Sequence, residues 1–381
     1  MKVLDITLFY PPQAGGAVTT TMEFIKALVA LGHEVHVLAP AEGENIDSLK
    51  LKKINYKKPL DHTVHRVKLP RKYKKWTVSF VYFFYAYKYL KKTKFDAILA
   101  HFHFNTSIGW TAFLLSKLFK CKLYVRIHDL YEPITWKQKL FYSVNRIPLK
   151  YSTKILTINQ VSKDFLIAKN YAPITSIEVI PNGVSGIEYN KDIMKSKNKV
   201  CFLGTISANR GFNLLIPVVK EIKKKLDNIE VHLIGEGPGI EAIKEIIQKD
   251  IELNGNIFIY GALEREHALN IVAEMDVCLG LLGRDNSNEY QLLIKLIESI
   301  HLGIPWVSVS TKGVNEFHGQ TDSGLIVPEK VEHIADAIVK LLNDEQLYQN
   351  KVENGIRNRN QFNWNEISLK LDALLQNGGI S

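Results

Sequence analysis

One segment constrains the fold of this chain more than any other: residues 201–211, which read Cys-Phe-Leu-Gly-Thr-Ile-Ser-Ala-Asn-Arg-Gly. An apolar strand ends at Gly204, a polar loop follows, and a helix begins close to Arg210 and Gly211. In such a turn, backbone N–H groups and one guanidinium surround the place where a phosphate would bind. The segment therefore predicts a strand–loop–helix unit of a parallel sheet, with a loop that binds an anion.

Short apolar runs alternate with helical intervals on both sides of this segment. The first half contains predicted strands at 2–9, 34–38, 64–69, 96–100, 122–127, 154–158 and 176–180, and the alternation resumes at residue 199 and continues to about residue 342. This pattern predicts an α/β protein with a Rossmann-like, doubly wound parallel sheet in each half. Ligands of such sheets bind at the carboxyl ends of the strands.

The length of 381 residues suits two domains, each large enough to bury a core. Residues 185–198 are polar and rich in lysine, as in an interdomain linker. We therefore predict an N-terminal domain at 1–190 and a C-terminal domain at 191–360. Residues 361–381 have helical periodicity and form a predicted terminal helix.

Charged residues are distributed unevenly between the two halves of the chain. Residues 1–190 contain 28 Lys and Arg against 13 Asp and Glu, whereas the whole chain contains 49 against 39. A basic first domain suits an anionic partner, and the membrane surface is favoured because no nucleic-acid-binding motif accompanies the charge. No apolar run approaches the roughly 18 residues of a membrane span, and the first residues read as a strand with an acid inside it. We expect a cytoplasmic protein, peripheral at the inner face of the cell membrane.

Residues 71–95 combine eight Lys and Arg with ten aromatic residues. Aromatic rings with polar tips suit the lipid interface, and flanking cations suit anionic headgroups. A core helix with basic ends is the alternative, but such a helix needs fewer tyrosines. The candidate membrane contacts at its start are Lys72, Lys74, Lys75 and Trp76.

Three motifs together resemble family 4 of the retaining glycosyltransferases, which have the glycosyltransferase-B fold of two facing Rossmann-like domains. They are Pro11-Pro-x-x-Gly15-Gly16, the run from Glu298 to Pro305 that fits Glu-x-x-x-x-Gly-x-Pro, and the tail Phe362-Asn-Trp364. The resemblance covers nearly the whole chain. It implies transfer of a sugar from a nucleotide diphosphate sugar to a glycan or lipid-linked acceptor, in polysaccharide or glycoconjugate assembly. It also implies that the terminal helix packs back on the first domain.

The same resemblance assigns the residues that bind the donor. Arg210 and the glycines beside it would hold the diphosphate, and Glu298 would accept hydrogen bonds from the ribose hydroxyls. The turn at Gly235 matches a family turn and is weak evidence for a dinucleotide site by itself. The implied donor contacts are Gly15, Gly16, Gly204, Arg210, Gly211, Gly235, Gly261, Glu289, Leu293, Ile294, Lys295 and Glu298.

Two positions depart from the family pattern. Thr205 stands where the family has a first arginine, and Lys295 is a candidate to replace that cation. Tyr290 stands where the family has the first of two glutamates, with Glu289 one residue earlier. These departures leave open a non-catalytic member that binds sugar nucleotides. A sugar-nucleotide epimerase or hydrolase of the same fold is a separate alternative.

Histidines follow two of the predicted strands, at His101, His103 and His128. Isolated histidines are usually structural, but the resemblance places His128 against the transferred sugar, and His103 is a candidate acceptor contact. The predicted catalytic residues are thus His128, Arg210 and Glu298, with no protein nucleophile. No third ligand is spaced for zinc and the chain has no Asp-x-Asp, so we expect an enzyme without metal or other cofactor.

Overall fold

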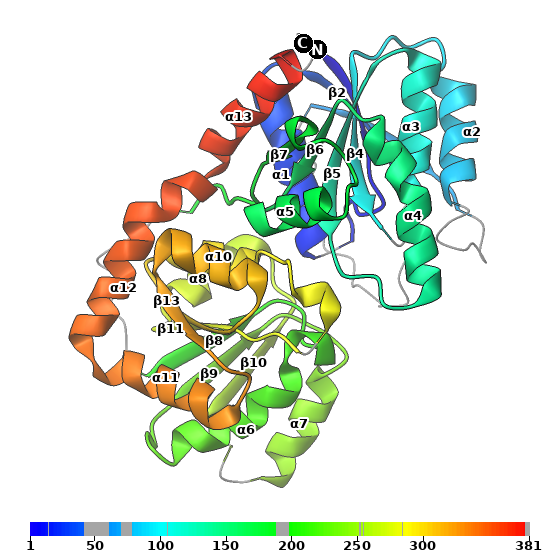
Figure 1. Ribbon diagram of the computed structural model, residues 1–381. Coiled ribbons are helices and arrows are strands. Elements are labelled where there is room, and N and C mark those ends of the chain that lie inside the picture. The colour runs from blue at the N-terminus through cyan, green and yellow to red at the C-terminus, as the bar shows by residue number, and fades with distance from the viewer. Residues whose placement is uncertain are drawn as a thin grey trace. The chain divides into compact units, whose positions relative to one another are not determined.

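The computed structural model describes residues 1–13, 15–41, 61–69, 78–104, 106–187, 198–250, 253, 255–283 and 285–377. The chain forms two compact units (Figure 1). Unit 1 contains Met1–Gly183 and Trp364–Ser381, and unit 2 contains Val184–Asn363. The structure thus divides the chain after Gly183 and Asn363, where the sequence placed the divisions after residues 190 and 360.

Unit 1 is built on a seven-stranded parallel sheet with the order β3-β2-β1-β4-β5-β6-β7. The strands are β1 (Lys2–Ile6), β2 (Glu34–Pro40), β3 (Thr63–Val67), β4 (Ala97–His103), β5 (Lys122–Asp129), β6 (Lys154–Thr157) and β7 (Ile177–Val179). The helices are α1 (Gly16–Ala30), α2 (Val78–Leu90), α3 (Ile108–Phe119), α4 (Trp136–Lys150), α5 (Gln160–Ala168), the 3-10 helix η1 (Ile174–Ser176) and α13 (Trp364–Asn377). The strand order reverses between β1 and β4, so their carboxyl ends border the usual ligand site of such a sheet.

Unit 2 repeats this architecture with a six-stranded parallel sheet in the order β10-β9-β8-β11-β12-β13. The strands are β8 (Lys199–Leu203), β9 (Glu230–Ile234), β10 (Ile257–Gly261), β11 (Val277–Gly280), β12 (Trp306–Val309) and β13 (Gly324–Val327). The helices are α6 (Phe212–Lys223), α7 (Ile240–Lys249), α8 (Arg265–Ala273), α9 (Ile294–His301), α10 (Lys312–Thr321), α11 (Val331–Asn343) and α12 (Glu345–Asn358), with 3-10 helices η2 (Ala208–Arg210), η4 (Asn286–Asn288) and η5 (Arg359–Phe362). The two sheets confirm the predicted α/β class with two doubly wound domains.

Apolar residues that are buried on both faces explain why these strands lie inside a parallel sheet. All seven residues of β4 are buried, and so are all four of β11 and of β12. Helices on each side cover the sheets, because such strands leave no face for water.

The terminal helix α13 packs on unit 1. Trp364 is buried and lies edge-on against Phe24 of α1, with 4.9 Å between ring centroids. The hydroxyl of Tyr124 donates to the carbonyls of Leu374 and Leu375 at 3.3 and 3.2 Å. The helix is therefore part of the core of unit 1.

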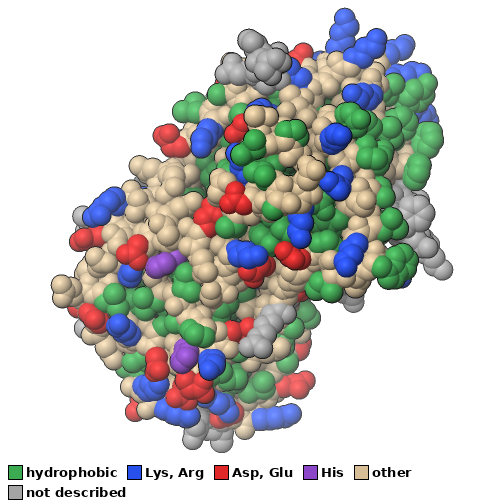
Figure 2. All heavy atoms as spheres, in the orientation of Figure 1, with side chains coloured by type: hydrophobic (Ala, Val, Ile, Leu, Met, Phe, Trp, Pro, Cys, Tyr) green, Lys and Arg blue, Asp and Glu red, His purple; other side chains and the backbone are tan. Residues whose placement is uncertain are grey.

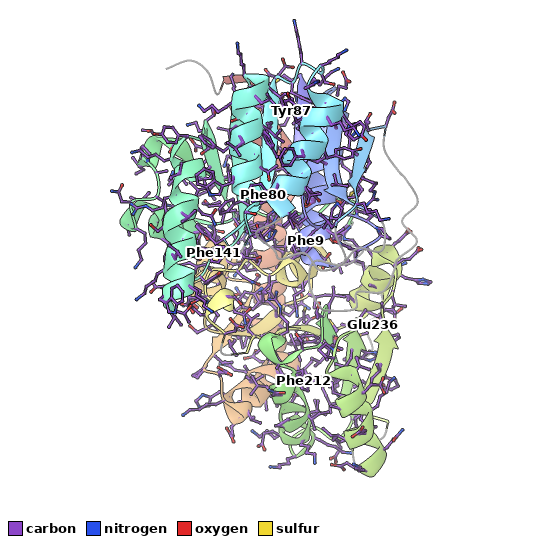
Figure 3. All side chains as sticks on the ribbon, turned by 90° about the vertical axis from the view of Figure 1, so that its right-hand side faces the viewer. Phe9, Phe80, Tyr87, Phe141, Phe212 and Glu236 are labelled. Carbon is purple, nitrogen blue, oxygen red and sulfur yellow. The ribbon has the colours of Figure 1, made fainter. Side chains whose placement is uncertain are left out.

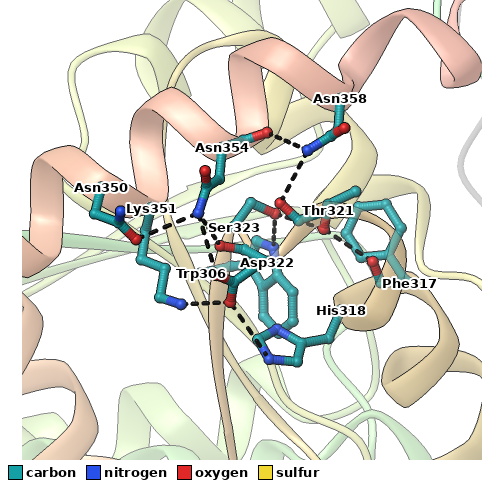
Figure 4. A network of polar contacts seen from close by, with 10 residues as sticks. All are labelled: Trp306, Phe317, His318, Thr321, Asp322, Ser323, Asn350, Lys351, Asn354 and Asn358. Atoms are coloured by element: carbon teal, nitrogen blue, oxygen red, sulfur yellow. Dashed lines mark hydrogen bonds and ion pairs between the residues drawn. The ribbon is translucent and has the colours of Figure 1, made fainter.

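A polar network fixes α12 to the edge of the unit 2 sheet (Figure 4). Asp322, which has a left-handed backbone, accepts hydrogen bonds from Lys351 Nζ at 2.5 Å and from Asn354 Nδ2 at 3.1 Å. Beneath it, Trp306 Nε1 donates to Ser323 Oγ at 2.9 Å. The network anchors α12 before the chain continues through η5 into α13.

Candidate functional site

The glycine loop after β8 rests on a second glycine turn in unit 2. The Gly204 N–H donates to the Ile234 carbonyl at 2.9 Å, and the Ile206 N–H donates to the Glu236 carbonyl at 3.0 Å. A Cβ on Gly235, whose φ is +137°, would lie 2.0 Å from the Gly204 carbonyl oxygen. A Cβ on Gly237 would lie 2.1 Å from the Ile206 carbonyl oxygen. The turn that begins at Gly235 therefore supports the loop through backbone contacts, which only glycine permits.

Helix α6 begins directly after this loop. Gly211 is its N-cap, with a φ of +75°, and offers no side chain to accept from the N–H groups of the first turn. A Cβ there would lie 3.0 Å from Leu281 Cβ. The first N–H groups of a helix have no acceptor within the helix and carry a partial positive charge. The Phe212 N–H donates to the Ser207 carbonyl at 3.3 Å and the Leu214 N–H donates to the Gly211 carbonyl at 3.0 Å, so the feature that suits a phosphate here is the positive end of the α6 dipole.

Arg210 lies at the end of η2, between the loop and α6. Its Nη1 donates to Gln291 Oε1 at 2.6 Å and to Asn288 Oδ1 at 3.4 Å. Both acceptors are uncharged amides, so they orient the guanidinium without cancelling its charge. The sequence analysis missed Asn288 and Gln291, because they lie about eighty residues away and no spacing rule links them to Arg210.

Lys295, in the first turn of α9, lies against the same loop. Its Nζ is 3.7 Å from the ring centroid of Phe202, and its Cε is 3.9 Å from the position of a Cβ on Gly204. Burial lowers the pKa of Lys295 to about 8, and the positive charge of Arg210 lowers it as well. The structure thus brings a second cation to the loop that contains Thr205.

We expect binding of UDP or GDP to weaken by up to about tenfold between pH 7 and pH 9. Lys295 is cationic below its pKa of about 8 and loses its charge as the pH rises through that value. Isothermal titration at pH 7, 8 and 9 measures the effect, and Lys295→Arg is the matched control because a guanidinium stays protonated throughout. Equal pH dependence of the two proteins would contradict the role of Lys295.

Glu298 is held by an arginine that the sequence did not indicate. The Glu298 side chain belongs to α9, and the residue is 6% exposed. Its Oε1 accepts from Arg265 Nε at 3.1 Å, while Arg265 Nη1 donates to the Ser185 carbonyl at 3.2 Å. A carboxylate has enough lone pairs to accept from Arg265 and from a ribose diol together. The geometry is therefore compatible with the ribose role that the resemblance implied.

The neighbouring departure from the family pattern is buried. Tyr290 accepts a hydrogen bond at its hydroxyl from Lys312 Nζ at 3.1 Å, and its ring lies 4.8 Å from that nitrogen. Glu289 is the C-cap of η4, and its carbonyl accepts from the Gly313 N–H at 3.0 Å. Tyr290 is thus tied to the start of α10, and Glu289 is the half-buried acid beside it.

The remaining predicted donor contacts lie at element ends in unit 2. Leu293 is the N-cap of α9 and Ile294 is its first residue, so their N–H groups face out of the helix start. Gly261 ends β10 with a φ of +73°. A Cβ on Gly261 would lie 3.8 Å from Glu236 Oε1, so the two glycine turns of unit 2 are neighbours.

A histidine cluster occupies the carboxyl ends of β4 and β5 in unit 1. The ring of His128 stacks near those of His101 and His103, with centroids 4.9 and 5.3 Å away. His101 contacts His128 at 2.7 Å and Asp5 at 3.0 Å, and His103 Nδ1 lies 2.6 Å from Asp129 Oδ2. Burial, the two other histidines and Arg126 hold the pKa of His128 well below its usual value. His128 is therefore a neutral imidazole near pH 7.

Gly15 and Gly16 lie at the start of α1, after β1. Gly15 is the N-cap with a φ of +129°, and no described atom lies within 4 Å of a Cβ placed on it. Its backbone conformation, and not lack of space, explains the glycine. Gly16 is the first residue of the helix, which has no acid in its first turn.

Exposed apolar side chains lie on three neighbouring helices of unit 1, α2, α3 and α4. Figure 3 labels Phe80 and Tyr87 of α2 and Phe141 of α4 among them. Lys72, Lys74, Lys75 and Trp76 lie outside the described residues. Helix α2 buries Tyr82 and Ala86, but Phe80 and Phe84 on its other side are 60% and 63% exposed. Helices α3 and α4 contribute Leu114, Leu118, Trp136, Leu140, Phe141, Val144 and Ile147. The sequence analysis did not identify α4 as part of this surface.

No helix in the described parts of the chain combines the length and the apolar character of a bilayer span.

A cavity of about 470 Å³ borders the start of α6 in unit 2. Its lining includes Gly211 and Leu214, but also the acids Asp285 and Glu329, which repel anions. We therefore assign the phosphate to the side of the Gly204 loop where Lys295 lies, and not to this cavity. Over the described ranges, no three side chains of His, Cys, Asp or Glu are placed to hold a metal ion.

Two protein families account for most of the chain. Residues 14–185 match the family described as Glycosyltransferase Family 4, and residues 188–358 match Glycosyl transferases group 1. An uncharacterized glycosyltransferase of Methanocaldococcus jannaschii is 23% identical over 389 residues, which cover 96% of this chain and 95% of that protein.

Solved structures of low sequence identity share the fold. Sucrose-phosphate synthase from Thermosynechococcus elongatus superposes with a TM-score of 0.79 at 16% identity, covering 99% of this chain and 98% of that one. The Anabaena protein HepE, solved in complex with UDP-glucose, superposes with a TM-score of 0.70 at 14% identity, covering 99% of this chain and all of that one.

Proposed function

This chain belongs to the group 1 glycosyltransferases of the glycosyltransferase-B fold, and from that premise we propose that its donor is a nucleotide diphosphate sugar. The sugar is transferred with retention at the anomeric carbon to a glycan or lipid-linked acceptor. The product belongs to cell-surface polysaccharide or glycoconjugate assembly.

One observation carries the proposal: Lys295 lies against Gly204, and Arg210, at the start of α6, is near enough to lower the pKa of Lys295. Gly204 lies near Lys295 Cε, and Gly211, next to Arg210, caps the helix. Two cations and the positive end of a helix dipole suit a group with two or more negative charges, such as a diphosphate. The solved relative HepE binds UDP-glucose, which supports the same class of donor.

The proposed mechanism stabilises the departing nucleotide diphosphate. As the bond from the sugar to the phosphate breaks, negative charge grows on the phosphate oxygen, and Arg210 and Lys295 interact with it most strongly at that point. Glu298 fixes the ribose and His128 contacts the sugar. The acceptor hydroxyl attacks from the same face, and its proton passes to the departing phosphate, so no protein nucleophile is required. The two cations take the place of a divalent metal.

A thermal-shift panel tests the donor class. Nucleoside diphosphates and their sugars should raise the melting temperature, and the preferred base should be evident from UDP against GDP and ADP. Nucleosides without phosphates should have little effect. Stabilisation by nucleosides as large as by diphosphates would contradict the proposal.

Two rival functions remain distinct from this one. Buried Tyr290, at the position of a family glutamate, favours a non-catalytic protein that binds sugar nucleotides. A sugar-nucleotide epimerase or hydrolase would share the donor loop as well. The first rival predicts binding without turnover, and the second predicts turnover without an acceptor.

We also propose that the acceptor is reached at an anionic membrane. The apolar face, defined as the exposed apolar side chains of α2, α3 and α4, has basic neighbours and no acid in any of the three helices. The basic residues are Lys88, Lys117, Lys137, Lys139, Arg146 and Lys150. In Figure 2, hydrophobic side chains gather at the right-hand edge of the view, over α2 and α4, with Lys and Arg side chains around them. This combination suits a bilayer interface with anionic headgroups.

Replacing Phe80 and Phe84 by serine should weaken binding to anionic vesicles by about tenfold or more, since each ring loses apolar burial in the bilayer. Flotation with phosphatidylglycerol-containing and neutral vesicles measures the effect. Binding to the anionic vesicles should also fall with salt, because charge attraction is screened. Leu369→Ser is the matched control, because Leu369 is equally exposed (59%) but lies on α13. An equal loss in the control, or no preference for anionic lipid, would overturn the proposal.

A further inference from the structure

Glu298 lies on the same face of α9 as the cation that contacts the Gly204 loop. It follows Lys295 by three residues in this helix, and residues at that spacing are neighbours on the helix surface. Lys295 lies against Gly204, directly after β8. The strand order of unit 2 reverses between β8 and β11, the strand that precedes α9. Ligands of such sheets bind at this point, so the Glu298 carboxylate borders the proposed donor site.

Arg265 donates to one oxygen of this carboxylate. Its Nε donates to Glu298 Oε1 at 3.1 Å. Its Nη2, which shares an edge of the guanidinium with Nε, is buried and makes no hydrogen bond within the described residues. Pairs of arginine and carboxylate are frequently bidentate, and an unpaired buried donor costs free energy. The pair thus lacks the arrangement that would stabilise the fold most, and Nη2 does not engage Glu298 Oε2.

A backbone contact fixes the guanidinium in this orientation. Arg265 Nη1 donates to the Ser185 carbonyl at 3.2 Å. The chain beside Ser185 is itself held within unit 2, because the Val184 N–H donates to the Phe362 carbonyl at 2.9 Å and Val184 forms a parallel bridge with Asn363. The guanidinium is planar and rigid, so the contact at Nη1 restricts the direction of Nε. Arg265 therefore places Glu298 Oε1 relative to a fixed point on the backbone.

The charge of Arg265 also suits a carboxylate that binds hydroxyl groups. Glu298 is 6% exposed, and a buried carboxylate is costly unless a cation pairs with it. Arginine stays protonated in proteins, and an ionised carboxylate only accepts hydrogen bonds. A ribose diol offers two hydroxyl donors, whereas 2′-deoxyribose offers one. A carboxylate that is held in this way can therefore distinguish the two sugars.

We propose that Arg265 is a positioning residue that orients the Glu298 carboxylate toward the ribose hydroxyls of the donor, and thereby makes the protein selective for ribonucleotides over 2′-deoxyribonucleotides. The inference rests on the proposed function in one respect, namely that Glu298 contacts the ribose. It assigns a purpose to the first residue of α8, which the sequence analysis did not single out. An arginine with a purely structural role would affect stability and leave the choice of sugar unchanged.

Isothermal titration with UDP and 2′-deoxy-UDP tests this, or with GDP or ADP and its 2′-deoxy form if the thermal-shift panel selects that base. The wild type should bind the ribonucleotide at least about tenfold more tightly, which is the effect of one charged hydrogen bond. In Arg265→Ala this ratio should fall by about fivefold or more, because the carboxylate is no longer oriented. Arg359→Ala is the matched control, because Arg359 is also half-buried and its Nη1 donates to the His301 carbonyl at 3.1 Å, at the end of α9. It should keep the wild-type ratio.

A double variant tests whether Arg265 acts through Glu298. In the Glu298→Gln background, Arg265→Ala should change the ratio no further, since no carboxylate remains to be oriented. Additive losses would show that Arg265 affects the choice of sugar by another route and would contradict the inference. If Arg265→Ala does not fold, Arg265→Lys replaces it, because lysine keeps the charge but lacks the fork that reaches Ser185 and Glu298 together. Its ratio should also fall, and a wild-type ratio would be the contradicting result.

The two nucleotides also separate this inference from the proposed function. Equal affinity of the wild type for both would overturn the inference before any variant is made, while the diphosphate assignment would stand. An unchanged ratio in a folded Arg265→Ala protein would overturn it as well. If the wild type binds neither nucleotide, the proposed function fails and the inference fails with it.

Discussion

Replacing Arg210 by alanine is expected to weaken binding of the preferred nucleoside diphosphate by about 10- to 150-fold, since a charged hydrogen bond contributes about 1.5–3 kcal/mol. Binding of the nucleoside without phosphates should change by less than about twofold, because Arg210 lies at the loop and the helix start that suit the diphosphate. Isothermal titration of both ligands against both proteins measures the difference.

Arg357→Ala is the matched control for this variant. It removes the same charge from unit 2, but Arg357 is exposed on α12 and is not part of the glycine loop. Its affinity for the diphosphate should equal that of the wild type. Equal losses of nucleoside and diphosphate binding in Arg210→Ala would show that the variant disturbs the whole site and that the diphosphate assignment is wrong.

Replacing Gly235 by alanine is expected to lower the melting temperature of unit 2 by roughly 10 °C, which corresponds to about 3–5 kcal/mol for a unit of this size. The added Cβ would lie 2.0 Å from the Gly204 carbonyl oxygen, and the φ of +137° is strained for any residue with a side chain. Either the turn at Gly235 or the loop at Gly204, which is the proposed phosphate loop, must therefore move. Calorimetry measures the melting temperature. Titration with the diphosphate measures the affinity, which falls if the Gly204 loop has moved.

Two other glycines separate the effect of steric overlap by the added Cβ from the effect of backbone strain. Gly319→Ala lies inside α10 with no described atom within 4 Å of the added Cβ, so it should be close to neutral. Gly255→Ala also meets no described atom but has a φ of +87°, so it isolates backbone strain of about 1–3 kcal/mol. If Gly235→Ala is as stable as Gly319→Ala, the supporting role of the turn is contradicted.

Much of the fold could be predicted because the information is local. Buried runs such as Cys201–Leu203 and Trp306–Val309 alternate with helices, and this pattern alone indicates parallel sheets. The loop at Gly204 could also be predicted, because a strand that ends at a glycine before a helix is a local feature of the sequence. The terminal helix was predicted from the helical periodicity of residues 361–381, and its packing on the first domain from the resemblance of the tail motif.

The partners of the site residues could not be predicted. Arg265 reaches Glu298 from another helix, and Gln291 reaches Arg210 from the segment between η4 and α9, so each contact depends on tertiary packing. Asp5 indicated only that the first strand is not a signal sequence, whereas the structure pairs it with His101. The exposed side of α4 was missed because apolar periodicity does not reveal whether the apolar side is covered.

Glycosyl transfer itself is the most direct test of the central claim. The protein is incubated with the nucleotide diphosphate sugar selected by the thermal-shift panel and with a lipid extract as the source of acceptor, with and without EDTA. Release of the nucleotide diphosphate is measured, and NMR reports the anomeric configuration of the product. We predict acceptor-dependent release that survives EDTA, falls at least about tenfold in Arg210→Ala and retains the donor configuration. Donor binding without release under any of these conditions would contradict the account and identify a non-catalytic member of the family.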